Sequence, residues 1–158
     1  MTVECGQAAS FFLPNEKIIC IEALGGGIVN DTWRLTLQSG TRYILQRLNP
    51  AVFPDPGAVQ RNLRKVTEHI HTQLPALSHL HDRDLVLFRP VETHNGEISY
   101  TDSTGTCWRL LTHIDHTCSL HSITTPGQAE EIGATLGLFH QLLATLPPES
   151  LTDPLPGL

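Results

Sequence analysis

The sequence lacks long hydrophobic runs, an excess of basic residues and any paired cysteine motif. No apolar stretch comes near the roughly 18 residues that a transmembrane helix needs, so we expect no membrane contact. Ten Lys and Arg stand against 16 Asp and Glu, and the net charge of −6 argues against binding to nucleic acid. Residues 1–16 have neither the basic start nor the apolar stretch of a secretory signal. The four cysteines show no C-x-x-C spacing, which is typical of a reducing cytoplasm, where we expect this protein to reside.

Nine histidines are present, yet they do not follow a metal-ligand pattern. His69 and His71 are two residues apart, whereas ligands on one helix face lie three or four apart. His113, His116 and His121 are close in sequence, but no cysteine or second histidine pair completes a tetrahedral set. We therefore predict no metal site in these residues, and keep a histidine-based metal-binding protein as an alternative hypothesis.

The stretch from Lys17 to Asn49 combines three glycines with alternating apolar and polar residues. An apolar run ends at Gly25–Gly27, and residues 32–37 then alternate with period two, which predicts a half-buried strand. A turn at Gly40 leads into another strand. The following helix and the Gly-Lys-Ser/Thr ending of a Walker loop are absent. A glycine flap between antiparallel strands is how kinase-like folds cover nucleotide phosphates, and a plain hairpin turn is the alternative.

The sequence after residue 49 predicts two amphipathic helices. Apolar residues recur every three or four positions over 57–74, with Asp55 as the N-cap and Pro75 as the expected end. A capping box begins at Thr125, because a Gln stands three positions later. We expect the helix that follows to bury an apolar stripe made of Ile132, Leu136, Phe139, Leu143 and Leu146.

Short strands are expected between these two helices. They are predicted over 85–88, 98–101 and 107–114, with Asn95-Gly96 as a hairpin turn. A short helix is expected over 8–13. One antiparallel sheet with a helix packed on it is an α+β fold, which is the fold class that we predict for this chain.

Four segments of the sequence resemble the aminoglycoside-phosphotransferase branch of the protein-kinase-like superfamily. They read GGGIVNDTWRL, RYILQRLNPAVFPDPGAVQRNLRKVTEHI, CWRLLTHIDHT and GLFHQLLATLP. Within the superfamily they are most similar to N-acetylhexosamine 1-kinases, also called mucin-desulfatase-like proteins. The similarity spans nearly the whole chain and corresponds to the first half of such an enzyme. It implies a nucleotide-covering N-terminal lobe over 1–111, a hinge over 112–116, and the incomplete start of a second lobe with one long helix over 117–158.

The resemblance implies ATP with Mg²⁺ as cofactor and nucleotide contacts from the flap, two strands and the hinge. The residues so implied are Gly25, Gly26, Gly27, Ile28, Asn30, Thr32, Ile44, Gln46, Thr112, His113 and Ile114. Gln46 stands where kinase-like folds usually place a Lys or Arg against the phosphates. Its neighbour Arg47 is a possible phosphate contact if a bulge turns it inward. We expect Gln46 to bond to Asn62 or His69, and Glu68 to face solvent.

The resemblance implies no catalytic residue within this chain. His113-Ile114-Asp115 spells the start of the family's catalytic loop, but Leu120 stands where that loop has its metal-binding Asn. We expect neither a catalytic Asp nor Mg²⁺ ligands after Leu146, although phosphoryl transfer needs both. The prediction is the ATP-binding part of an amino-sugar kinase, whose sugar would bind only with the missing lobe. The alternative is a stand-alone lobe that binds a partner or self-associates through an exposed inter-lobe surface.

Overall fold

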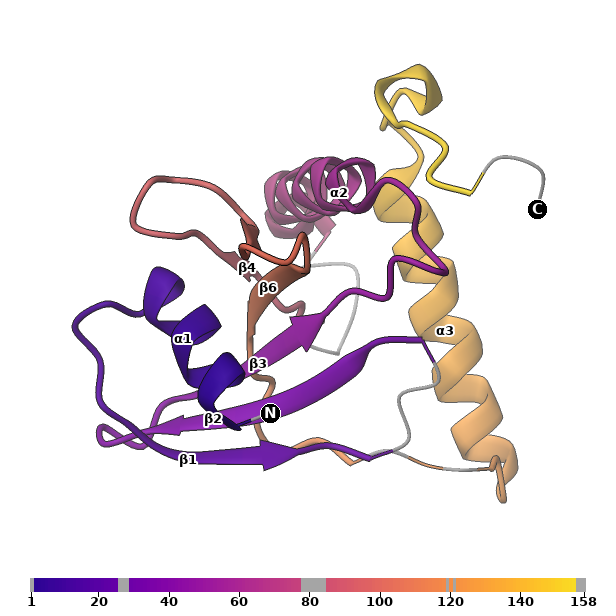
Figure 1. Ribbon diagram of the computed structural model, residues 1–158. Helices are drawn as coiled ribbons and strands as arrows, with labels where there is room; N and C mark the ends of the chain where they lie inside the picture. The colour runs from indigo at the N-terminus through magenta and orange to yellow at the C-terminus, as the bar shows by residue number, and fades with distance from the viewer. Residues whose placement is uncertain (1, 26–28, 78–84, 119, 121, 156–158) are drawn as a thin grey trace.

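The computed structural model describes residues 2–25, 29–77, 85–118, 120 and 122–155. Its α+β fold is that of a kinase-like N-terminal lobe, with helices around one antiparallel sheet (Figure 1). The helices are α1 (Thr2–Phe12), α2 (Pro56–Leu77), α3 (Pro126–Leu143) and the 3-10 turn η2 (Pro148–Ser150). The strands are β1 (Ile18–Ala23), β2 (Asp31–Leu37), β3 (Arg42–Arg47), β4 (Pro90–Val91), β5 (Tyr100–Thr101) and β6 (Cys107–Thr112). Of the helices described, none has the length and apolar character to cross a membrane.

The sheet begins with the predicted meander. Its order is β1-β2-β3-β6-β4, with β5 also pairing with β6, and every pairing between the described strands is antiparallel. The β2–β3 turn needs Gly40, which adopts a φ of 88° that side-chain-bearing residues seldom take. β6 therefore joins the end of the meander from a distant part of the sequence, and it is an interior strand with β3 on one side and β4 and β5 on the other.

The core lies between α1 and one face of the sheet. The sheet contributes six buried side chains to it: Trp33, Leu35, Leu37, Leu45, Trp108 and Leu110. Ala8 and Ala9 on α1 are 1% and 0% exposed, because their small side chains let the helix approach the strands closely. α1 is longer than the helix predicted over 8–13, since Cys5 in its first half is also part of this core.

α2 begins as predicted but ends later. The Asp55 Oδ1 accepts a hydrogen bond of 2.9 Å from the Ala58 N–H, which confirms the N-cap. The prediction that Pro75 ends the helix is wrong, because α2 continues to Leu77. A proline so close to a helix end interrupts few intrahelical bonds, so the helix tolerates it there.

The strands between α2 and α3 are shorter than predicted. Residues 85–88 form no strand, and their place beside β6 is taken by β4, which is two residues long. Val86 is 62% exposed. The apolar run at 85–88 lines a groove beside α3 and does not contribute to a sheet core. The turn at Asn95-Gly96 is confirmed, with Gly96 at a φ of 80°. β6 ends at Thr112, two residues earlier than predicted.

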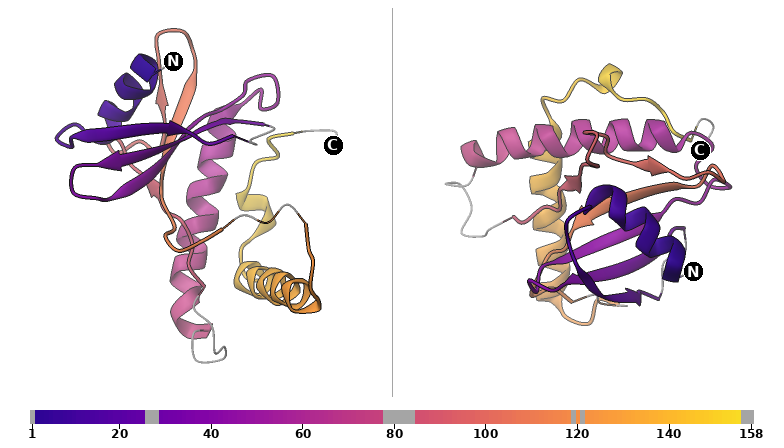
Figure 2. Two further views of the ribbon diagram at one scale, coloured as in Figure 1. Left: turned by 90° about the horizontal axis from the view of Figure 1, so that it is seen from below. Right: turned by 60° about the vertical axis from the view of Figure 1, so that its left-hand side comes forward.

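α3 has the predicted start but not the predicted burial. Thr125 and Gln128 form the capping box. The stripe expected to be buried is largely exposed: Ile132, Leu136 and Phe139 are 51%, 52% and 36% exposed. Leu142 is the buried residue of α3. The helix lies against α2, on the opposite side of the molecule from α1 (Figure 2), so its other side has no element of the described chain to cover it.

Candidate functional site

The site that the sequence predicts falls on the sheet face opposite α1. Side chains alternate along a strand, so the residues between the core positions of β2, β3 and β6 point the other way. Among them are the partly buried Thr32, Arg34, Ile44, Gln46 and Arg109, and the buried Cys107 and Leu111. This face, here called the open face, is turned toward the side of the molecule on which α3 lies (Figures 1 and 2).

A row of three polar side chains crosses the open face. Thr32, Gln46 and Arg109 are direct register partners on β2, β3 and β6. The Gln46 Nε2 donates to the Thr32 Oγ1 over 3.2 Å, and the Arg109 Nε donates to the Gln46 Oε1 over 2.9 Å. The structure therefore joins two predicted site residues to an arginine that the prediction did not include.

Asn62 and His69, the expected partners of Gln46 on α2, bond to other residues. Asn62 exchanges two hydrogen bonds with the backbone of Thr152, at 2.6 and 3.0 Å, and the His69 Nε2 lies 3.2 Å from the Thr145 Oγ1. The expected contact with Asn62 or His69 is thus wrong, because both side chains hold the segment that follows α3. Glu68 is exposed, as predicted, and lies 3.9 Å from Arg64 in an i, i+4 pair.

The base of the glycine flap lies beside this polar row. The Leu24 N–H donates to the Thr32 carbonyl over 2.8 Å, which closes the flap where β2 begins. The Asn30 Oδ1 accepts a bond of 3.1 Å from the Asn49 N–H and ties this point to the end of β3. A side chain at Gly25 would meet nothing within 4 Å. The predicted residues Gly26, Gly27 and Ile28 lie outside the described residues.

The predicted hinge residues follow β6 directly, next to the part of β3 that carries Ile44. Ile44 pairs with Leu111, and the Thr112 N–H donates to the Arg89 carbonyl over 2.9 Å. His113 and Ile114 follow as irregular, partly buried chain, and the Ile114 carbonyl accepts a 3.0 Å bond from the Thr117 hydroxyl.

One acidic side chain anchors this hinge segment to the sheet. The Asp115 carboxylate lies 2.8 Å from the His113 Nδ1 and 2.6 Å from the Arg42 guanidinium on β3. The hydrogen bond from His113, and then the charge of Arg42, lower the pKa of Asp115 below its ordinary range. Residues 113–115 are thereby held beside the start of β3.

Arg47 is not brought to the predicted site. The β2–β3 register runs without a bulge from Asp31↔Arg47 to Thr36↔Arg42, so Arg47 points to the α1 face. Its guanidinium lies 5.8 Å from the ring centroids of both Trp33 and Trp108 and 2.7 Å from the Asp31 carboxylate. The cation-π contacts and the ion pair give Arg47 a structural role in closing the core.

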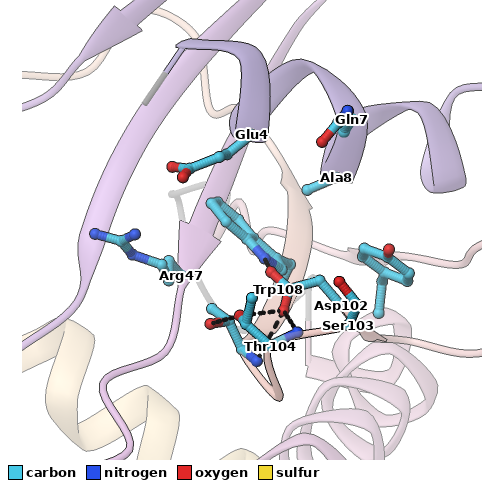
Figure 3. A pocket seen from close by; sticks show the side chains of 10 residues that line it. Glu4, Gln7, Ala8, Arg47, Asp102, Ser103, Thr104 and Trp108 are labelled. Carbon is cyan, nitrogen blue, oxygen red and sulfur yellow. Dashed lines mark hydrogen bonds between the residues drawn. The ribbon is translucent and has the colours of Figure 1, made fainter.

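A pocket opens on the α1 face (Figure 3). It has a volume of about 210 Å³ and lies between α1, Arg47 and the β5–β6 turn. At its base the Asp102 carboxylate accepts hydrogen bonds from Thr104, over 2.6 Å, and from the Trp108 indole, over 2.9 Å. These bonds, that from Thr104 first, lower the pKa of Asp102 to about 2. The Asp102 carboxylate is already hydrogen-bonded to residues of its own turn and of β6. We therefore assign Asp102 a structural role in holding the β5–β6 turn.

The residue that sequence reasoning missed is Arg109. The signal was present: Arg109 is a lone cation in the apolar strand Cys107–Thr112, at a position where arginine is rarely buried without a reason. Which strand would lie beside it could not be read from the sequence, because Gln46 is 63 positions away.

Comparison with known protein families assigns most of this chain to one family. The profile of the phosphotransferase enzyme family (APH) matches residues 21–158. The match begins within β1 and includes the flap, the polar row, the hinge segment and α3, whereas α1 precedes it. It covers well over half of the chain, and the chain therefore belongs to the phosphotransferase enzyme family.

Proposed function

We propose that this chain is the nucleotide-binding N-terminal part of a small-molecule kinase, and that ATP binds on the open face. In this proposal residues 1–111 form the lobe that covers the nucleotide, 112–116 the hinge and 117–158 the start of a second lobe. The observation that carries the proposal is the position of Asn30, Thr32 and Gln46 beside the flap base, with Ile44 two residues before Gln46 on the same face of β3, within a chain of the phosphotransferase family.

Each part of the open face suits one part of ATP. Backbone N–H groups of the flap can donate to phosphate oxygens, because glycine allows close approach. The amide of Gln46 is a further donor, and Ile44 gives the adenine ring an apolar surface. The His113 carbonyl and the Ile114 N–H are the backbone groups that we assign to the adenine edge, since the His113 N–H donates to the Arg42 carbonyl and the Ile114 carbonyl accepts from Thr117.

The residues present fit a polyanionic cofactor. The partly buried Arg109 carries a positive charge beside the predicted phosphate position. When bound with Mg²⁺, ATP supplies the phosphoryl group that a kinase transfers. We assign none of the described residues to the Mg²⁺ ion, which the phosphate oxygens would carry into the site.

As acceptor we propose a hydroxyl of an amino sugar, with N-acetylhexosamines first. This choice rests on the similarity of the four sequence segments to N-acetylhexosamine 1-kinases. Formation of sugar phosphate from ATP, Mg²⁺ and a panel of N-acetylhexosamines, measured on the whole gene product, tests it. Phosphorylation of aminoglycosides alone would assign a different acceptor. We further propose a cytoplasmic location, which suits the four free cysteines.

ATP added to the ¹⁵N-labelled chain is expected to shift amide signals at residues 25–32, 44–46 and 112–115. The affinity should be roughly millimolar, about −4 kcal/mol, because one side of the nucleotide stays in contact with water. Amides on the α1 face, such as those of Gln7 and Ser103, serve as internal controls and should not move. Shifts centred on His69 and His71, or shifts that follow Zn²⁺ instead of ATP, would favour the metal-binding alternative.

A specific surface favours a second candidate function, self-association. A groove of about 480 Å³ between α2 and α3 is lined mainly by apolar side chains, among them Ile70, Val86, Ile132, Leu136 and Phe139. Exposed apolar surface of this kind commonly marks an interaction site. We propose that a second copy of the chain covers it.

Sedimentation velocity is expected to show a mass that rises with protein concentration. Leu136→Glu should reduce this association at least about tenfold, since a buried unpaired charge at an interface costs several kcal/mol. Val3→Glu is the matched control, because Val3 is 73% exposed and lies on α1, away from the groove. A wild-type chain that stays monomeric at high concentration would rule out the second candidate.

A further inference from the structure

We propose that Arg109 supplies the phosphate-binding cation that β3 lacks, and that Gln46 positions it. The inference rests on the proposed function, because it concerns the nucleotide that the open face binds. It moves the positive charge of a kinase-like phosphate site from the third strand of the meander to its neighbour β6.

The charge of Arg109 has an unusual setting within this chain. Five other arginines lie against carboxylates: the pairs are Arg34–Glu22, Arg42–Asp115, Arg47–Asp31, Arg61–Asp55 and Arg64–Glu92. In the described part of the chain, no carboxylate lies within ion-pair distance of Arg109. Its neighbours along β6, Trp108 and Leu110, are buried.

A partly buried guanidinium whose hydrogen bond within the described chain is to a neutral amide is poorly compensated. Burial lowers the pKa of Arg109, yet arginine keeps its proton in proteins, so the charge remains. The Gln46 Oε1 satisfies the Nε–H. Desolvating a charge without an opposite charge costs free energy, and an anionic ligand on the open face would remove this cost.

The position of Arg109 suits a phosphate under the flap. It lies in the same row as Gln46 and Thr32, and Thr32 closes the flap base through its backbone. On the hinge side, the next open-face pair is Ile44 with Leu111, where we place the adenine. Phosphates of a nucleotide that spans this face would therefore meet the polar row. The planar fork of a guanidinium can bind two phosphate oxygens at once.

The same geometry explains why residue 46 is a glutamine. A lysine there would face Arg109 directly across the β3–β6 pair, and like charges in that arrangement are destabilising. Glutamine instead accepts from Arg109 and donates to Thr32, which fixes the direction of the guanidinium. Gln46 is thus a positioning residue as well as a donor.

The test compares adenosine, AMP, ADP and ATP by NMR titration of the whole 158-residue chain. In the wild type, affinity should rise with the number of phosphates. Arg109→Met should weaken ADP and ATP binding about tenfold or more, as expected for loss of a hydrogen bond to a charged group, and leave adenosine unchanged. Arg61→Met is the control: it removes the same charge from an exposed site on α2, and should change ATP affinity less than about twofold.

A charge-swap variant makes the result decisive. Gln46→Lys in the Arg109→Met background returns a cation to the row from β3, and should restore most of the ATP affinity. If Arg109→Met does not fold, Arg109→Lys is compared with the swap variant, and both should keep the gain from adenosine to ATP. Equal weakening of adenosine and ATP, unchanged ATP binding, or failure of the swap to restore affinity would overturn the role of Arg109. A wild-type chain that binds no nucleotide at all would instead overturn the proposed function itself.

Discussion

Replacing Trp108 with alanine is expected to lower the free energy of unfolding by about 3–5 kcal/mol. Trp108 is 2% exposed and lies in β6, an interior strand of the sheet. Its ring centroid is 5.6 Å from that of Trp33, and its indole N–H donates to Asp102. The truncation would leave a cavity beneath α1, remove a stacking surface from Arg47 and leave Asp102 without one donor.

Because domains of this size are stable by only about 5–15 kcal/mol, such a loss is a large fraction of the total. Urea unfolding followed by far-UV circular dichroism measures it. Ile19→Ala on β1 is the control, since Ile19 is 60% exposed and should change stability by less than about 1 kcal/mol. A loss from Trp108→Ala as small as that of the control would mean that α1 and the sheet do not share this core.

Leu142→Ala is expected to detach α3 from α2 while the sheet stays folded. Leu142 is 1% exposed, whereas the apolar residues one and two turns earlier on α3 are largely exposed. Losing a buried leucine costs about 2–5 kcal/mol. Leu142 is the buried residue of α3, so this cost should fall on the docking of the helix.

Hydrogen exchange resolves this local effect. The amides of α3 should exchange about 30-fold faster or more in Leu142→Ala, which corresponds to the lower limit of that cost. Amides in β2, β3 and β6 should keep their wild-type rates. Leu136→Ala is the matched control on the same helix, because Leu136 is 52% exposed. Uniform acceleration across the sheet and α3 would show that the two unfold as one unit.

Local patterns predicted the parts of the fold that depend on neighbouring residues. Alternation over 32–37 identified β2, and the side-chain bonds of Thr125 and Gln128 fixed the start of α3. Long-range packing decided the rest. Residues 85–88 have the composition of a strand but face α3, and the stripe on α3 looks like a buried face although nothing in the described chain covers most of it.

The sequence could predict the site residues that match the family's pattern within a single strand. Asn30, Thr32, Ile44 and Gln46 were assigned in this way, and Thr32 and Gln46 are cross-strand partners on the open face. The contact of Gln46 with Arg109 was not predictable, because it depends on which strand follows β3 in the sheet. The sequence suggested α2 as the neighbour, and the fold places β6 there instead.

The packing of Arg47 against Trp33 and Trp108 also determines what tryptophan fluorescence can report. The chain has two tryptophans, and both lie on the α1 face in contact distance of one guanidinium. Intrinsic fluorescence should therefore follow the opening of the α1 core with high sensitivity. Nucleotide on the open face would be separated from both indoles by the thickness of the sheet, so occupancy there should leave the emission spectrum almost unchanged. An optical titration of this protein requires a chromophore introduced on the flap or the hinge.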